Sequence, residues 1–392
     1  MTEVFEDREL CTGCAACRQV CPQHAIEMKA NDEGFLYPEI NGERCNDCRL
    51  CQRTCPVNKA VNATATGEDA GLPFEGHKAY ACFSNDEQIR SESSSGGIFT
   101  QLAHSFISRN GVVFGAEFDD AFRVRHSYVE NTEGLDTLRR SKYVQSDIED
   151  TYAKARELLN AGRPVLYCGT PCQAAGLRAF LNKEYDDLLI CDLACHGVPS
   201  PEVWRMYLDF IKGRYQSPIA SISFRDKSTG WNDSSMKILF KDGRQYIDKV
   251  KREIFFIGFG KSIFNRSSCY SCRFRINNTK ADITLADFWG IDRQGGSDFM
   301  DNKGVSLVIT HTEAGDKALS QIQDRICMKQ RSFDEAVKYN PRLISSVAEP
   351  DGRKSFFEDL KAGHSFDLLR RKYMDNFSIK YRVKSLIKLL LK

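Results

Sequence analysis

The sequence lacks any long hydrophobic run. No stretch of its 392 residues reaches about 18 consecutive apolar residues, so no membrane-spanning helix is expected. It also lacks an excess of charge of one sign, since the formal net charge is +2, and this gives no support to nucleic-acid binding. The first residues, MTEVFEDREL, are acidic without an apolar core, which predicts that there is no signal peptide. These absences favour a protein of the reducing cytoplasm.

Cysteine, in contrast, is abundant, with 16 residues. Half of them lie in two runs of identical spacing, Cys11-x2-Cys14-x2-Cys17-x3-Cys21-Pro22 and Cys45-x2-Cys48-x2-Cys51-x3-Cys55-Pro56. This spacing is typical of a ferredoxin module that holds two [4Fe–4S] clusters. Zinc usually binds two separated cysteine pairs, and disulfide frameworks belong to small secreted chains, so the spacing disfavours both.

Each cluster is expected to take three thiolates from one run and the fourth from the other. One set is Cys11, Cys14, Cys17 and Cys55, and the other is Cys45, Cys48, Cys51 and Cys21. Between the runs, residues 25–37 predict a strand, a turn and a second strand. The small and polar residues 58–71 predict a flexible linker.

Beyond residue 78, short apolar runs alternate with amphipathic helical stretches. Strands are expected at 79–83, 112–118, 124–129, 165–168, 188–193, 220–224, 236–240, 283–286 and 305–310. Helices are expected at 98–108, 150–160, 173–181, 202–212 and 314–323. This alternation predicts an α/β domain with a mixed sheet, preceded by a small α+β ferredoxin domain of the bacterial type. The predicted boundaries are 1–62 for the ferredoxin domain, 63–77 for the linker, 78–345 for the α/β domain and 346–392 for a helical tail.

Two glycine-containing segments of the α/β domain are candidate ligand sites. Residues 93–97 (SSSGG) precede a predicted helix. The residues alone favour a serine-capped helix, and the alternative is a site where close backbone approach and free N–H groups attract phosphate. Residues 168–172 (CGTPC) connect a strand to a helix, which suits a phosphate or a flavin edge; a turn with two inert thiols is the alternative.

Further cysteines are scattered through this domain. The pair Cys269 and Cys272 supplies half of a metal site, which Cys172 and Cys195 could complete as a third cluster. The remaining thiols are expected to be inert, namely those of Cys82, Cys168, Cys191 and Cys327. Single histidines are expected to be structural or solvated rather than catalytic, as at His77, His104 and His126.

Six motifs follow one another in the second domain. They are Ser94-Ser95-Gly96-Gly97, 141–146 (SKYVQS), 169–173 (GTPCQ), 195–200 (CHGVPS), Cys269-x2-Cys272 and 282–290 (DITLADFWG). In this order they resemble the beta-subunit family of coenzyme F420-reducing hydrogenases and dehydrogenases, which also includes the plant 7-hydroxymethyl chlorophyll a reductase.

The resemblance implies FAD and at least one [4Fe–4S] cluster in the second domain. FAD would be bound by Ser95, Gly96, Gly97, Thr100, Lys142, Tyr143, Gly169 and Thr170. A third cluster would be held by Cys172, Cys195, Cys269 and Cys272. Lys142 and His196 are candidate catalytic proton donors.

The implied protein is an iron–sulfur flavoprotein oxidoreductase. Electrons would pass between the clusters and FAD, and from FAD to or from a two-electron carrier or substrate. Its partner would be a redox protein or a small redox carrier. The alternative is an electron-transfer subunit that has no substrate of its own and feeds a partner enzyme.

The end of the chain predicts a basic amphipathic helix at 378–392. Apolar residues recur there at helical spacing, between several lysines and arginines. The simpler expectation is that this helix docks on its own domain, and the alternative is contact with a partner or with the inner face of a membrane. The expected location is therefore the cytoplasm, with peripheral attachment to the inner face of the membrane as the alternative.

Overall fold

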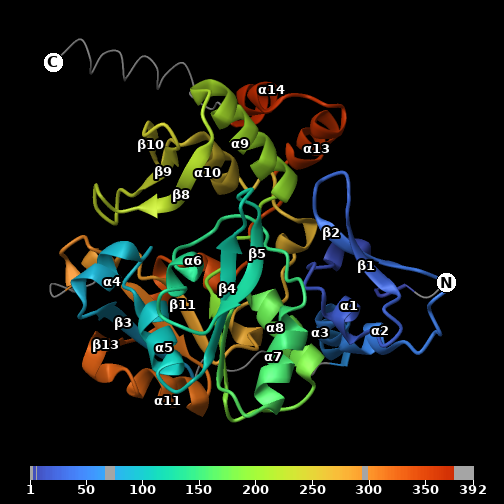
Figure 1. The fold of residues 1–392 in the computed structure, drawn as a ribbon, viewed down its shortest axis with the longest axis horizontal. Coiled ribbons are helices and arrows are strands. Elements are labelled where there is room, and N and C mark those ends of the chain that lie inside the picture. The colour runs from blue at the N-terminus through green and yellow to red at the C-terminus, as the bar shows by residue number, and fades with distance from the viewer. Residues whose placement is uncertain (1–2, 6, 67–75, 294–298, 375–392) are drawn as a thin grey trace.

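The computed structural model of the chain describes residues 3–5, 7–66, 76–293 and 299–374. The strands in these ranges are β1 (Ile26–Ala30), β2 (Leu36–Ile40), β3 (Lys78–Ser84), β4 (Val112–Phe118), β5 (Val124–Val129), β6 (Val165–Cys168), β7 (Leu188–Leu193), β8 (Ile219–Asp226), β9 (Ser235–Phe240), β10 (Gln245–Lys249), β11 (Ile283–Asp287), β12 (Ser306–Thr310) and β13 (Ile326–Arg331). The α-helices are α1 (Ala16–Val20), α2 (Leu50–Thr54), α3 (Pro56–Thr66), α4 (Glu87–Glu92), α5 (Ile98–Ile107), α6 (Leu135–Leu138), α7 (Thr151–Asn160), α8 (Pro171–Leu181), α9 (Pro201–Tyr215), α10 (Ile254–Gly260), α11 (Glu313–Ser320), α12 (Phe333–Lys338), α13 (Arg353–Lys361) and α14 (Phe366–Leu369). Figure 1 shows their arrangement.

The N-terminal module consists of the hairpin β1–β2 and the helices α1, α2 and α3. The two strands are antiparallel, as the sequence predicted, with Ile26 opposite Ile40. Residues 58–66 differ from the expected flexible linker, because they continue helix α3. Proline is well suited to the first turn of a helix, and Val57 and Ala60 bury their side chains in a cluster that includes Ala175 of α8. Packing on the second domain therefore outweighs the polar composition of this segment.

A mixed eight-stranded sheet forms the centre of the second domain, in the order β13-β3-β12-β11-β7-β6-β4-β5. The four strands β4, β6, β7 and β11 run parallel to one another. The outer strands β5, β12, β3 and β13 pair antiparallel with their neighbours. Helices α7 and α8 cover one face, and α5 and α11 cover the other (Figure 1). The mixed α/β class predicted from the sequence is confirmed. The carboxyl ends of the four parallel strands meet at one edge, where ligands bind in open α/β sheets.

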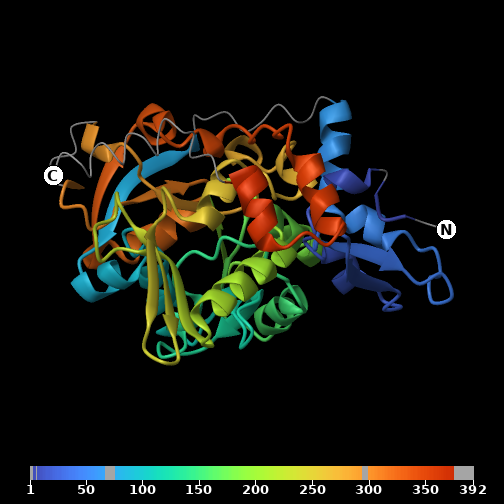
Figure 2. The same ribbon diagram turned by 90° about the horizontal axis from the view of Figure 1, so that it is seen from above.

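A second, three-stranded antiparallel sheet, β10-β9-β8, packs with α9 and α10 in a cluster rich in aromatic residues. Helices α13 and α14 join the same cluster, and so do Phe35 and Tyr37 of the N-terminal module. Figure 2 shows these late helices between the three-stranded sheet and the N-terminal module. Segments from both halves of the chain therefore share one core.

In the ranges that the structure describes, no helix has both the length and the apolar character needed to cross a membrane. The predicted basic helix at 378–392 lies outside the described residues, as does the 67–75 part of the predicted linker.

Candidate functional site

Four thiols surround a hollow of about 310 Å³ in the N-terminal module, those of Cys11, Cys14, Cys17 and Cys55. Cys11 and Cys14 lie on the loop that enters α1, where Ala15 adopts a left-handed conformation with φ of +58°, and Cys17 lies in the first turn of the helix. Cys55 joins them from the junction of α2 and α3. The structure thus brings together the four residues that the spacing assigned to one cluster.

A second hollow, of about 360 Å³, is lined by the other predicted set, Cys21, Cys45, Cys48 and Cys51. Its loop repeats the first, because Arg49 before α2 also has φ of +58°. Cys48 is exposed and the other three thiols are half-buried. The second hollow therefore lies nearer the surface than the first, in which all four thiols are buried.

The donor chemistry of both hollows fits an iron–sulfur core. The thiols line the walls and do not converge on one point: within the described ranges, no three metal-binding side chains are placed for a single ion. A cubane needs such spread thiolates, one for each iron. Burial raises the pKa of the Cys14 and Cys17 thiols well above the usual value, and their neighbouring thiols raise it further. A positively charged core reverses this effect, since metal binding deprotonates its thiol ligands.

The scattered cysteines of the second domain also lie together. Cys172 lies in the first turn of α8, and Cys195 follows β7. Cys269 ends the short 3-10 helix Ser267–Cys269, and Cys272 lies just after it. Burial raises the pKa of the thiols of Cys172, Cys195 and Cys269 to about 12, and in each case another thiol of this set raises it further. Four thiols gathered in this way are a candidate donor set for a further cluster.

Polar groups around this third set support the same interpretation. The N–H of Val198 points to Sγ of Cys269 at 3.4 Å, and Oγ1 of Thr170 lies 3.2 Å from Sγ of Cys172. Asn265 is fully buried, and neither atom of its side-chain amide has a hydrogen-bond partner in the described part of the chain. A Cβ on Gly197 would lie 2.6 Å from Nδ2 of Asn265 and 3.3 Å from Cβ of Cys269. The amide therefore lies beside the thiols, where a cluster sulfur would accept its hydrogen bond.

Helix α8 connects the third set to the first hollow. It carries Cys172 in its first turn and Gly176 one turn later. A Cβ on Gly176 would lie 2.9 Å from Cβ and 3.0 Å from Sγ of Cys14. The thiol of Cys172 also contributes to the raised pKa of Cys14. The first hollow and the third set are therefore neighbours across one helix.

Arg266 fastens the N-terminal module to the second domain. Its guanidinium is fully buried and donates to the carbonyl oxygens of Cys11 at 2.6 Å and Leu36 at 3.0 Å, and to Oε1 of Gln145 at 3.1 Å. It also lies over the ring of Tyr37, 4.1 Å from its centroid. The cysteine spacing could not predict this residue, because its partners are distant in the sequence.

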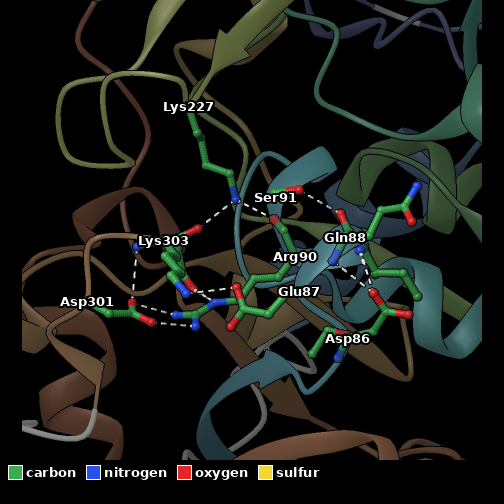
Figure 3. A network of polar contacts seen from close by, with 11 residues as sticks. Asp86, Glu87, Gln88, Arg90, Ser91, Lys227, Asp301 and Lys303 are labelled. Atoms are coloured by element: carbon green, nitrogen blue, oxygen red, sulfur yellow. Dashed lines mark hydrogen bonds and ion pairs between the residues drawn. The ribbon is translucent and has the colours of Figure 1, made fainter.

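The predicted flavin loop, residues 93–97, is held largely by the protein itself. Gly96 lies against two strands, since a Cβ there would be 2.4 Å from the carbonyl oxygen of Cys82. Gly97 has φ of +90°, and Thr100 is buried in α5. The ammonium of Lys227 donates to the carbonyl oxygens of Arg90, Ser95 and Lys303, and Figure 3 shows its approach to Arg90. The two glycines are therefore explained by packing, so replacing Gly97 would test folding rather than flavin binding.

The other predicted flavin residues converge on the same edge of the sheet. The N–H of Ser141 donates to Oγ of Ser94, which brings Lys142 and Tyr143 beside the loop. Lys142 donates to the carbonyl oxygens of Thr137 and Arg139, and burial lowers the pKa of its ammonium to about 7.

Gly169 and Thr170 lie at the carboxyl end of β6. Thr170 caps α8 together with Gln173. A Cβ on Gly169 would lie 3.4 Å from Nε2 of His126, whose lowered pKa reflects burial first and the charge of Lys142 as a smaller cause. These two residues therefore border the same region as Lys142.

Arg225 is a residue of this region that sequence reasoning missed. Its side chain is buried and contacts Oδ2 of Asp287 at 3.0 Å and the hydroxyl of Tyr143 at 3.2 Å. Its Nη2 has no hydrogen-bond partner among the described residues. Beside it, the parallel rings of Trp231 and Trp289 stack with centroids 4.9 Å apart. The sequence pointed to this region only through the 282–290 motif, which contains the Asp287 that Arg225 contacts.

His196, the second predicted proton donor, contacts different residues from those that Lys142 contacts. Its Nε2 lies 3.0 Å from Oγ of Ser262, and its ring packs on Phe259 with centroids 4.7 Å apart. Burial lowers the pKa of the imidazole to about 4, so the ring is neutral at pH 7.

Fold and thiol sets together define an iron–sulfur protein of the electron-transfer type. Residues 10–59 match the 4Fe–4S dicluster domain, and residues 162–336 match the family described as the C terminus of the coenzyme F420 hydrogenase/dehydrogenase beta subunit. Over these two regions the chain is therefore similar to the C-terminal part of that beta-subunit family and to a 4Fe–4S dicluster domain.

No curated protein matches this chain. Among solved structures, a chain of the xenon-derivatised F420-reducing [NiFe] hydrogenase complex from Methanosarcina barkeri is similar at 15% identity and a TM-score of 0.44, covering 77% of this chain and 93% of that chain.

Proposed function

We propose that this protein is an oxidoreductase that moves electrons between three [4Fe–4S] clusters and FAD, and between FAD and a two-electron carrier or substrate. The observation that carries this proposal is the chain of thiol sets: an outer hollow, an inner hollow, and a third set one helical turn away on α8. In this scheme, residues 1–62 carry two clusters, and residues 78–345 carry the third cluster and FAD.

Clusters supply one-electron transfer, and FAD couples single electrons to two-electron chemistry. Cys21, Cys45, Cys48 and Cys51 form the outer site, which a redox partner can approach because Cys48 is exposed. The side-chain amide of Asn265 lies beside the third set, and the N–H of Val198 donates to Sγ of Cys269.

FAD would be bound at the carboxyl edge of the parallel strands. Tyr143 offers a hydroxyl there, and Arg225 offers a guanidinium nitrogen that has no partner among the described residues, which suits an anionic group of the ligand. Lys142 is placed to hold or release a proton near neutral pH, because burial lowers the pKa of its ammonium to about 7.

Replacing Cys269 and Cys272 with serine should remove one cluster. Twelve thiols in three sets imply about twelve irons per chain, so the variant should retain about eight. Iron and acid-labile sulfide are assayed on anaerobically purified protein. Cys327→Ser is the matched control and should keep all iron, because this thiol belongs to none of the sets. Unchanged iron in the double variant would show that the third set is structural.

Arg225→Gln should lower flavin occupancy and leave the iron content unchanged, because a neutral side chain removes the charge offered to an anionic ligand. The absorbance spectrum of anaerobically purified protein measures both cofactors. Arg244→Gln is the control, since Arg244 is exposed and pairs with Asp242. Flavin bands absent already from the unaltered, iron-loaded protein would contradict the flavin proposal.

Reduction of a small two-electron acceptor by the isolated chain separates an enzyme from a subunit that only feeds a partner.

A further inference from the structure

A row of four polar side chains crosses the eight-stranded sheet. Asp192 of β7 lies beside Thr284 of β11, and their backbones are paired in register. The hydroxyl of Thr284 contacts Oδ1 of Asp192 at 2.5 Å and Nε2 of His311 at 2.7 Å. Nδ1 of His311 lies 2.8 Å from Nδ1 of His77. Since His311 follows β12 and His77 precedes β3, the row connects four neighbouring strands without a gap.

When Asp192 is ionised, the chemistry of the partners favours one direction for these hydrogen bonds. An ionised Asp192 only accepts, so Thr284 donates to it and its own oxygen accepts from Nε2–H of His311. Nδ1 of His311 is then an acceptor, and Nδ1–H of His77 donates to it. All three bonds therefore point toward the carboxylate. Such an arrangement transfers a proton by successive shifts, each along an existing hydrogen bond.

The inner end of the row reaches the third thiol set. Asp192, Thr284 and Cys195 line one hollow of about 220 Å³, together with Arg275 and Arg342. Burial raises the pKa of Asp192 to about 7, and the nearby Asp282 raises it as a smaller cause. The other titratable groups beside Asp192 are the buried thiols of Cys168 and Cys191. The carboxyl group is thus poised to gain a proton near neutral pH.

The outer end of the row lies near the surface. His77 and His311 are both half-buried, and the ring of His77 meets that of His311 edge to face with centroids 4.7 Å apart. The Nε2 atom of His77 is itself shielded from solvent, so proton entry requires this ring to move outward. Burial lowers the pKa of both rings, which keeps them neutral at pH 7 and able to pass a proton without storing it.

We propose that Asp192, Thr284, His311 and His77 form a proton relay that delivers one proton to Asp192 when an electron reaches the redox centre at Cys195. This rests on the proposed function, in which the N-terminal clusters supply that electron. A water molecule gives a proton to His77, His77 gives one to His311, His311 to Thr284, and Thr284 to Oδ1 of Asp192. One proton enters from solvent, the carboxylate becomes a carboxylic acid, and the added negative charge of the reduced centre is balanced.

A purely structural role for Asp192 is the competing explanation, and a second threonine separates the two. Thr279 donates to Oδ2 of the same carboxylate at 2.6 Å. It is not a member of the row, because the hydroxyl that contacts His311 there is that of Thr284. Thr279→Val and Thr284→Val therefore remove equivalent hydroxyl donors, and only Thr284→Val interrupts the relay. His311→Gln interrupts it at the next position with a side chain that still forms hydrogen bonds.

The experiment uses the full-length, cluster-loaded protein and follows proton uptake with a pH indicator after rapid reduction by dithionite. Thr284→Val and His311→Gln should slow proton uptake about tenfold or more, whereas Thr279→Val should change it less than about twofold. In the infrared difference between reduced and oxidised protein, a carboxylic-acid band should appear and be lost in Asp192→Asn.

Iron content, assayed on each sample, separates this proposal from the proposed function. Full iron with equal slowing by both threonine variants would overturn the relay, and so would a carboxylic-acid band that survives in Asp192→Asn. Iron for only two clusters in the unaltered protein would overturn the third cluster itself.

Discussion

Replacing Arg266 with methionine should lower the free energy of unfolding by about 3–5 kcal/mol. The buried guanidinium donates to three oxygen atoms, and a hydrogen bond to a charged group contributes about 1.5–3 kcal/mol. Methionine fills similar space but leaves these acceptors unpaired. The variant should also slow electron transfer from the N-terminal module, because Arg266 holds the carbonyl of Cys11 against the second domain. Anaerobic urea unfolding and rapid-mixing reduction measure the two effects.

Arg18→Met is the matched control for this prediction. Arg18 also bridges the two domains, through Oδ1 of Asp150 at 2.8 Å, but 80% of the Asp150 side chain is exposed. Exposed ion pairs contribute about 0–1 kcal/mol, so little change is expected. Equal losses of stability in the two variants would contradict the role assigned to Arg266.

Two helical glycines should respond to alanine with opposite signs. At Gly176 of α8 the added methyl group would lie 2.8 Å from the hydroxyl of Tyr152 and 2.9 Å from Cβ of Cys14. Overpacking of this kind costs about 1–3 kcal/mol, and here it pushes a cluster ligand. At Gly213 of α9 the methyl group meets nothing within 4 Å, so alanine should stabilise the helix by about 0.5–1 kcal/mol.

Electron paramagnetic resonance of the reduced protein provides the second readout. Gly176→Ala should alter or remove the signal of the inner N-terminal cluster, whereas Gly213→Ala should leave every signal unchanged. An unaltered spectrum together with unaltered stability in Gly176→Ala would show that α8 does not press on the first thiol loop.

The two N-terminal thiol sets were predictable because their geometry is local. Short segments of fixed spacing place three thiols along the wall of one hollow, and the repeat of the run supplies the fourth. The alternation of apolar runs and amphipathic stretches likewise predicted most of the central strands and helices, since buried strands such as β6 and β7 carry a strong apolar pattern.

Elements whose stability depends on distant partners were missed. Strands β10 and β13 lie at sheet edges and bury few side chains, so no periodic pattern marks them. Helix α3 is polar and small in composition, and it becomes helical where Val57 and Ala60 contact α8. His77 was expected to be structural or solvated, because its place in the row of Asp192 follows from strand pairing between residues that are far apart in the sequence. Arg225 and Arg266 were missed for the same reason.

The contacts that fasten the N-terminal module to the second domain also have a consequence for biosynthesis. Arg266 follows its partner Cys11 by 255 residues. Arg353 donates to the two carboxylate oxygens of Glu33 at 3.0 and 2.6 Å and follows that residue by 320. Because a growing chain emerges from its N-terminus, the two thiol loops are made long before the residues that bury them. Once α8 and Arg266 are in place, the inner thiols are covered. Cluster insertion into the inner loop is therefore expected while translation is still under way or before docking is complete, so that the order of synthesis itself keeps the site open to the assembly machinery.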